Sequence, residues 1–328
     1  METAGARRWR NALGCLGMAV ALMGMACGND GDDEPTGAAE GRLAQTFDFS
    51  GANFTVGSKE FTEQLTLGHI TRLALEAAGA NVKDEIGLEG SNVARQALTS
   101  GRIDMYWEYT GTGWITHLGQ EEPIADSRAQ YEAVAAKDLE EHGIRWLEPA
   151  PFENTYALAV REEAVDDLGV RTLSELPGLL ESDRGAATLC LGSEFSTRPD
   201  GLPGLESHYG FKLPPRNLTL VQDAVVYTQV DKGNPCNFGV VFTTDGRVDA
   251  LGLSVLDDDK SFFPKFNPSL NVRETVYQSH PELGKLAAEL ASALDEDTMT
   301  RLNAEVDVDG NEPEDVARRW LRQADLIG

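Results

Sequence analysis

Residues 54–79 read FTVGSKEFTEQLTLGHITRLALEAAG, and this stretch decides the fold. Its first four residues, Phe54–Gly57, are typical of a buried strand. Thr62 is the predicted N-cap of a helix, because Leu65, Ile70, Leu73 and Ala77 then follow at helical spacing. Gly79 stands where the C-terminal cap of that helix belongs. The stretch therefore predicts a strand that leads into an amphipathic helix.

The same alternation of strand and helix continues along the chain. We expect a second strand at Val82–Leu88, a short helix at Val93–Thr99 and a third strand at Ile103–Tyr109. This order predicts an α/β fold with a parallel sheet, in which ligands gather at the carboxyl ends of strands. Two polar groups follow such ends, Ser58-Lys59 and Thr110–Thr112, and both are candidates for a binding site.

Residues 106–114 read YWEYTGTGW, which places four aromatic rings in nine residues of a chain that is 7% aromatic. The run suits either a core strand with a bulky face or a wall of rings around a ligand. A ring face is electron-rich, so such a wall would suit a cation that cannot donate hydrogen bonds. On aromatic density alone we expect a core strand, with Tyr106, Trp107 and Trp114 as packing residues. Tyr109 stands at the carboxyl end of this strand, where a ligand would gather.

The N-terminal residues have the features of an export signal. Residues 1–26 contain three arginines, a short apolar stretch and then small residues directly before Cys27. We expect a lipoprotein signal peptide over residues 1–26 and a lipidated Cys27, with an ordinary secretory signal as the alternative. The acidic, Gly-rich residues 27–51 predict a flexible tether.

The charge excludes one class of partner. The chain has 54 acidic and 28 basic residues and a net charge of −26. Nucleic acid is not expected as a partner, because its phosphates would be repelled.

The cysteines fit an exported protein. Apart from Cys27 and one cysteine inside the signal peptide, the chain contains only Cys190 and Cys236. An even pair in an oxidising compartment predicts a disulfide, and two buried thiols are the alternative.

The sequence contains no motif that favours an enzymatic function. The chain has no Gly-x-Ser-x-Gly elbow and no phosphate loop, and its five histidines lack metal-binding spacing. Residues 305–311 resemble a calcium loop, but Pro313 and Val316 occupy its ninth and twelfth positions. We therefore expect no catalytic residues, no metal and no cofactor.

Five sequence blocks resemble a known family, the quaternary-ammonium (glycine betaine/choline/carnitine) substrate-binding proteins of bacterial ABC importers. They follow the order of the family and span nearly everything from residue 54 to the end. The blocks are GSKEFTEQ at 57–64, EYTGT at 108–112, NTYAL at 154–158, SEF with RPDG at 193–201, and TTDG at 243–246 with DDKSFFP at 258–264.

The resemblance implies an α/β, two-lobed periplasmic-binding-protein fold of type II with the ligand in a cleft between the lobes. Lobe 1 would contain residues 52–152 and 244–328, and lobe 2 residues 153–243. Closure of the lobes would present the ligand to a permease in the membrane. We expect a monomer that is held at the outer face of the cell membrane by its lipidated cysteine.

The resemblance also assigns the binding residues. An aromatic box would hold the quaternary ammonium, and fixed donors would hold the carboxylate of a betaine. Carnitine or ergothioneine is the alternative ligand, and a sensor is the alternative to a transport subunit. For each tyrosine of the box, packing in the core is the competing interpretation. The expected box residues are Tyr109, Tyr156, Tyr227 and Phe242, and the expected carboxylate donors are Lys59, Thr112 and Arg198.

Overall fold

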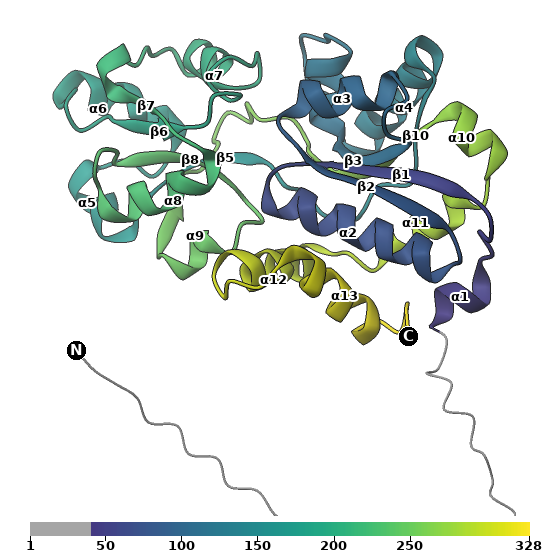
Figure 1. Cartoon of the computed structure of the whole chain (residues 1–328). Coiled ribbons are helices and arrows are strands. Elements are labelled where there is room, and N and C mark those ends of the chain that lie inside the picture. The colour runs from purple at the N-terminus through teal and green to yellow at the C-terminus, as the bar shows by residue number, and fades with distance from the viewer. Residues whose placement is uncertain (1–40) are drawn as a thin grey trace, which may run out of the picture. The chain divides into compact units, whose positions relative to one another are not determined.

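Two five-stranded sheets organise residues 41–328, the part of the chain that the computed structural model describes. Figure 1 shows β1, β2 and β3 of one sheet in purple and blue, and the strands of the other sheet in teal and green. In spatial order the first sheet contains β2 (Asn81–Leu88), β1 (Asn53–Lys59), β3 (Met105–Tyr109), β10 (Pro268–Arg273) and β4 (Ile144–Trp146), and the second contains β7 (Leu218–Leu220), β6 (Leu189–Leu191), β8 (Phe238–Phe242), β5 (Tyr156–Arg161) and β9 (Leu253–Val255).

The first lobe is the predicted strand–helix unit. β1 pairs in parallel with both β2 and β3, and β10 adds an antiparallel strand beside β3. Helix α2 buries Ile70 and Leu73 of the predicted apolar stripe in one core with Trp107, whereas Leu65 and Ala77 are only partly buried. The other helical segments here are α3 (Ser91–Thr99), the π-helical turn η1 (Thr112–His117) and α4 (Ser127–His142), in addition to α2 (Thr62–Ala77).

The beginning of α2 differs from the prediction. Phe61 has extended backbone and occupies the N-cap position, while Thr62 is the first helical residue. The Thr62 hydroxyl donates a hydrogen bond to Asp307 Oδ1 (2.7 Å) instead of capping the helix. A tertiary contact with the C-terminal part of the chain has replaced the local cap.

The second lobe surrounds the other sheet. β5 is antiparallel to its neighbours β8 and β9, whereas β6 is parallel to both β7 and β8. Apolar residues of β5, β6 and β8 form the centre of its core, including Val160, Leu189 and Phe238. Its short helical segments are η2 (Glu162–Ala164), α5 (Val165–Leu168), η3 (Leu173–Glu175), α6 (Leu176–Ser182), α7 (Leu202–Tyr209), η4 (Pro215–Asn217), α8 (Asp223–Lys232) and α9 (Arg247–Ala250).

The return to the first lobe comes later than the predicted residue 244. β9 forms the edge of the second sheet beside β5, and Val248 and Leu253 are buried with residues of that lobe. Phe262 and Phe263 also pack on the second-lobe core. Residues 247–263 therefore belong to lobe 2. A three-residue strand is too short to give a periodic signal in the sequence.

The predicted tether also extends too far. Residues Arg42–Thr46 form helix α1, and Leu43 and Phe49 are buried in the core of the first lobe. The Leu43 amide donates to the carbonyl of Leu326, which joins α1 to the C-terminal residues. Burial of these apolar side chains stabilises the segment against the lobe.

Helices complete the first lobe after β10. α12 and α13 contact α2 and run beneath it in yellow in Figure 1. Leu302 and Trp320 are buried in the core that includes the apolar face of α2. These helices are α10 (Glu274–Ser279), α11 (Leu283–Ser292), α12 (Glu296–Asp307) and α13 (Pro313–Gln323).

Three chain segments lie side by side where the lobes join. The Asn154 amide donates to the Phe266 carbonyl (3.1 Å), and the Thr243 amide donates to the Thr155 carbonyl (3.0 Å). Residues 153–155 lead into lobe 2, residues 264–267 lead back, and residues 243–245 are hydrogen-bonded to the first of these segments. We call these three segments the hinge.

The predicted signal peptide, Cys27 and the tether up to residue 40 lie outside the described residues. Within residues 41–328, no helix has the length and apolar character that crossing a membrane requires.

Candidate functional site

A pocket lies between the two lobes, beside the hinge. Its first-lobe walls follow the carboxyl ends of β1 and β3, where a parallel sheet is expected to place a ligand. The sequence-predicted residues Lys59, Tyr109, Thr112, Tyr156, Arg198 and Phe242 all line it, together with Glu60, Phe61, Ser91, Asn154, Glu194, Phe195, Asp223 and Phe266.

Aromatic rings form a continuous wall from one lobe to the other. Phe61 of lobe 1 stacks on Phe242 of lobe 2, with ring centroids 5.1 Å apart and planes within 14°. On its other side Phe61 stacks on Tyr109 at 6.2 Å. Tyr156 continues the wall through contacts of 5.0 to 5.7 Å with Phe195, Phe242 and Phe266.

Tyr109 has a defined position in this wall. Its hydroxyl donates to Glu63 Oε1 (2.6 Å), and Lys59 Nζ lies 4.8 Å from the centre of its ring. Burial, and then the Glu63 carboxylate, raise the pKa of the Tyr109 hydroxyl well above its usual range. The hydroxyl therefore keeps its proton and remains the donor to Glu63.

Lys59 forms a buried ion pair instead of offering a free ammonium. Its Nζ lies 2.7 Å from Glu108 Oε1, and both side chains are almost fully buried. The other carboxylate oxygen of Glu108, Oε2, accepts a hydrogen bond from the Tyr106 hydroxyl (2.9 Å) and lies 3.0 Å from His117 Nε2. Burial raises the pKa of Glu108, but the Lys59 ammonium and His117 outweigh it and hold this pKa below its usual range.

Arg198 is neutralised in a similar way. Asp200 accepts two hydrogen bonds from its guanidinium (2.8 and 2.6 Å), and Glu194 Oε1 accepts a third (2.8 Å). Two contacts then cross between the lobes: Arg198 Nη2 reaches Thr112 Oγ1 (3.4 Å), and Glu194 Oε2 accepts from the Ser91 amide (3.1 Å). The contact at Ser91 places a carboxylate at the N-terminus of α3, where helix amides favour negative charge.

Asp223, like Glu60, is an acidic group of the pocket that forms no ion pair among the described residues. Among residues 41–328, no side chain forms an ion pair or hydrogen bond with its carboxylate, which packs against the backbone of Gly192. Burial, followed by the negative charges of Glu60 and Glu194, raises the pKa of Asp223 to about 6. With the two basic groups already paired, the pocket has an excess of negative charge.

Tyr227 does not line this pocket, contrary to its predicted place in the aromatic box. It is 1% exposed and belongs to the lobe-2 core behind β8. Its hydroxyl accepts from the Phe242 amide (3.1 Å), and the Arg247 guanidinium lies 4.0 Å from the centre of its ring. Helix α8 turns this side chain toward the sheet, so it supports the strand that carries Phe242.

Several lining residues are not among those that the sequence predicts. Phe61, Asn154 and Phe195 stand inside the quoted sequence blocks, but lie next to residues that had already been assigned to the site. Phe266 and Asp223 lie outside every block, and only the folded chain brings them to the pocket.

A disulfide joins Cys190 and Cys236, whose Cα atoms are 5.6 Å apart. It links β6 to the loop that precedes β8, and both sulfur-bearing side chains are buried. Because β8 ends at Phe242, the disulfide anchors a strand that leads to the pocket.

Residues 52–323 match the family described as the substrate binding domain of ABC-type glycine betaine transport systems. The chain is 39% identical over 277 residues to the glycine-betaine-binding protein of Pseudomonas aeruginosa, covering 83% of this chain and 88% of the relative. It is 33% identical to the glycine betaine-binding protein YehZ of Escherichia coli, covering 82% and 89%. A crystal structure of a glycine betaine/carnitine/choline ABC transporter superposes with a TM-score of 0.67 at 26% identity, covering 84% of this chain and 98% of that one.

Proposed function

Because this chain belongs to the family of substrate-binding domains of ABC-type glycine betaine transport systems, we propose that it binds a quaternary ammonium osmoprotectant, glycine betaine, choline or a similar solute, in the ring-lined pocket. Members of this family are extracytoplasmic substrate-binding proteins of importers and not enzymes. The observation that carries the proposal is the wall of rings that runs from Tyr109 through Phe61 and Phe242 to Tyr156.

The chemistry of the walls suits this class of ligand. A quaternary ammonium has a diffuse charge and methyl groups but no N–H, so a ring face attracts it by about 0.5–2 kcal/mol when desolvated. The excess of carboxylates around Asp223 favours a cation over an anion at longer range. Lys59 and Arg198 are the proposed partners of a betaine carboxylate, which would share them with Glu108 and Asp200.

The size of the pocket supports a mechanism in which the lobes move. The cavity measures ≈ 30 Å³, which is room for about two water molecules. A trimethylammonium group needs more space, so the lobes separate at the hinge to admit the ligand and close around it. Closure would then present the loaded protein to an ABC permease.

We further propose that Cys27 is lipidated after removal of residues 1–26 and that the protein acts as a monomer at the outer face of the cell membrane. Two chain features support this placement: the small residues before Cys27 and the acidic stretch that separates it from α1. Mass spectrometry of the membrane-extracted protein should find an acylated N-terminal cysteine, and a free N-terminus at another residue would contradict the proposal.

A calorimetric panel tests the ligand class. Glycine betaine, proline betaine, choline, carnitine and ergothioneine are titrated into the mature protein, with glutamine as the control. We expect heat of binding with one or more of the quaternary amines and none with glutamine. Tightest binding of carnitine or ergothioneine would redirect the proposal to a bulkier trimethylated solute. Failure of all five to bind would overturn it.

The pH dependence of choline binding is a second test. Choline carries no titrating group, while burial and the charges of Glu60 and Glu194 raise the pKa of Asp223 to about 6. Below this pKa Asp223 is neutral, and above it the pocket gains a negative charge. Choline affinity should therefore rise roughly threefold to tenfold from about pH 5 to about pH 7.

The control for this prediction is Asp223→Asn, which removes the titrating carboxylate and should give a flat profile over the same range. Glu60, Glu194 and the Arg247 guanidinium also face Asp223, and they remain in the variant. A rise of equal size in Asp223→Asn would show that another group is responsible.

A further inference from the structure

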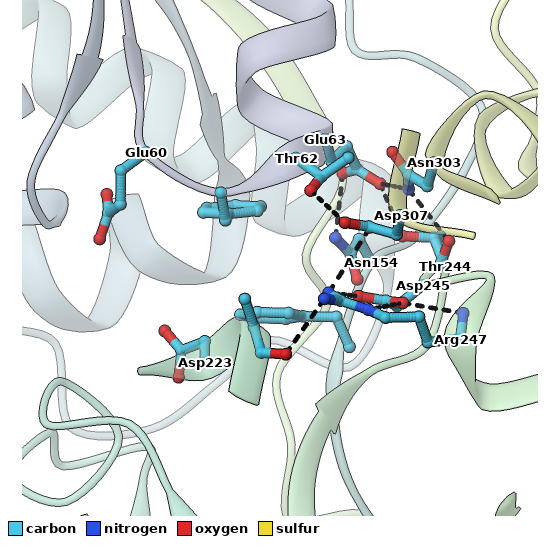
Figure 2. A pocket seen from close by; sticks show the side chains of 13 residues that line it. Glu60, Thr62, Glu63, Asn154, Asp223, Thr244, Asp245, Arg247, Asn303 and Asp307 are labelled. Carbon is cyan, nitrogen blue, oxygen red and sulfur yellow. Dashed lines mark hydrogen bonds and ion pairs between the residues drawn. The ribbon is translucent and has the colours of Figure 1, made fainter. Parts of the chain in front are cut away.

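Glu63 has an unusual set of partners for a buried carboxylate. It is 2% exposed, and no Lys, Arg or His among the described residues forms an ion pair with it. In Figure 2 dashed lines join its carboxylate to the uncharged side chains of Asn154, Thr244 and Asn303. It accepts hydrogen bonds from Tyr109 Oη (2.6 Å), Asn154 Nδ2 (3.0 Å), Thr244 Oγ1 (2.6 Å) and Asn303 Nδ2 (3.0 Å).

The four donors come from four separate chain segments, two of which belong to the hinge. Asn154 and Thr244 belong to the hinge, Asn303 belongs to α12, and Tyr109 ends β3 in the wall of the pocket. Glu63 itself lies in the first turn of α2. Asn303 also donates to the Thr244 carbonyl (3.0 Å), which closes the cluster. One carboxylate thus connects the hinge to a ring of the binding site.

Glu63 is separated from the ligand pocket. It lines the neighbouring pocket that Figure 2 shows, which shares Phe61 and Phe242 with the ligand pocket. The only pocket ring with which it forms a hydrogen bond is Tyr109, through the hydroxyl. Burial raises the pKa of Glu63, while hydrogen bonds from Thr244, Tyr109, Asn303 and Asn154 oppose this shift.

We propose that Glu63 is a positioning residue for the ligand site, because its hydrogen bond to the Tyr109 hydroxyl orients that ring and ties it to the hinge. The inference rests on the proposed function, since it assumes that Tyr109 contacts a quaternary ammonium. A ring attracts a cation only when its face is turned toward it. A phenol that is free to turn would lose part of this attraction even though the ring itself is kept.

The test is the affinity for choline, measured by calorimetry, in variants that remove this one bond. Tyr109→Phe keeps the ring and loses the hydroxyl, and we expect about tenfold weaker binding. Glu63→Leu keeps the approximate volume and loses the acceptor, and it should weaken binding by a similar factor. In the double variant the loss should again be about tenfold, because both changes remove the same bond. A loss near a hundredfold in the double variant would contradict the inference.

Two further variants separate positioning from general stability. Glu63→Gln retains an acceptor oxygen and should restore choline affinity to within about threefold of wild type. Asn303→Ala removes a different hydrogen bond to the same carboxylate and should lower the melting temperature while leaving affinity within about twofold. Thermal unfolding is recorded for every variant, and Tyr109→Phe decides the question if Glu63→Leu does not fold.

The two proposals fail in distinguishable ways. If wild-type protein binds no quaternary ammonium, the proposed function is wrong. If wild-type protein binds choline and Tyr109→Phe binds it equally well, only the positioning role of Glu63 is overturned.

Discussion

Replacement of Glu108 by Gln is expected to lower the free energy of unfolding by about 3–5 kcal/mol, because it leaves the buried Lys59 ammonium without its counterion. Both side chains of this pair are at most 5% exposed, so water cannot solvate the Lys59 ammonium in place of the missing carboxylate. The change should lower the melting temperature by roughly 6–15 °C in a calorimetric scan.

A matched control is available on the surface. Lys265 and Glu153 also form an ion pair (3.1 Å), but their side chains are 41% and 27% exposed. Glu153→Gln should therefore change the free energy of unfolding by less than about 1 kcal/mol. Equal effects of the two substitutions would show that burial of the Lys59–Glu108 pair has no energetic consequence.

The effect of pH on the Glu108 variant follows from the lowered pKa. A carboxylate whose pKa is lower in the folded state stabilises the protein above its unfolded pKa, and this stabilisation is lost as pH falls toward the folded value. The pKa of Glu108 lies below its ordinary 4.5 because Lys59 and His117 outweigh the effect of burial. The difference between wild type and Glu108→Gln should stay constant at neutral pH and shrink only in acid.

Replacement of Tyr109 by Leu is expected to weaken choline binding about 100-fold. The substitution removes a ring face worth up to about 2 kcal/mol to a desolvated cation, together with part of the apolar contact to the methyl groups. It also removes the hydroxyl that donates a hydrogen bond to Glu63. The loss should exceed that of Tyr109→Phe, which keeps the ring.

The control for Tyr109→Leu is Tyr277→Leu. Tyr277 also lies beneath a cation, with the Arg145 guanidinium 4.4 Å from its ring centre, but it packs on the core of the first lobe away from the pocket. Its replacement should leave choline affinity unchanged. Unaltered binding in Tyr109→Leu would remove Tyr109 from the site.

The sequence predicted the central features of the first lobe because they depend on local patterns. The apolar spacing of α2 and the strand on each side of it specify a parallel unit, and a parallel unit specifies the edge where Lys59 and Tyr109 meet. The order of the lobes came from the family resemblance. The predicted boundary between the lobes was wrong at β9, whose three residues pair with β5 without a periodic pattern of their own.

The features of the site that the sequence did not predict have another physical origin. A motif indicates which residue type stands at a position, but not the partner that its side chain finds. Lys59 and Arg198 line the pocket as predicted, yet Glu108 and Asp200 neutralise them through contacts that spacing does not reveal. Tyr227 has the residue type that a box requires, and the orientation of α8 directs its ring into the core.

The stacking of Phe61 on Phe242 sets a minimum contact energy that a ligand of the free site has to exceed. These two rings come from different lobes and already stack on each other. The net binding free energy of a ligand from the rings is therefore only the difference between its own ring contacts and the ring–ring contact that it displaces. A bare ammonium ion offers a charge but almost no apolar surface, so the exchange is unfavourable for it. Under the proposed function, a trimethylated cation would replace ring–ring contact with methyl–ring contact and add its charge, and the pocket would discriminate among cations by this exchange.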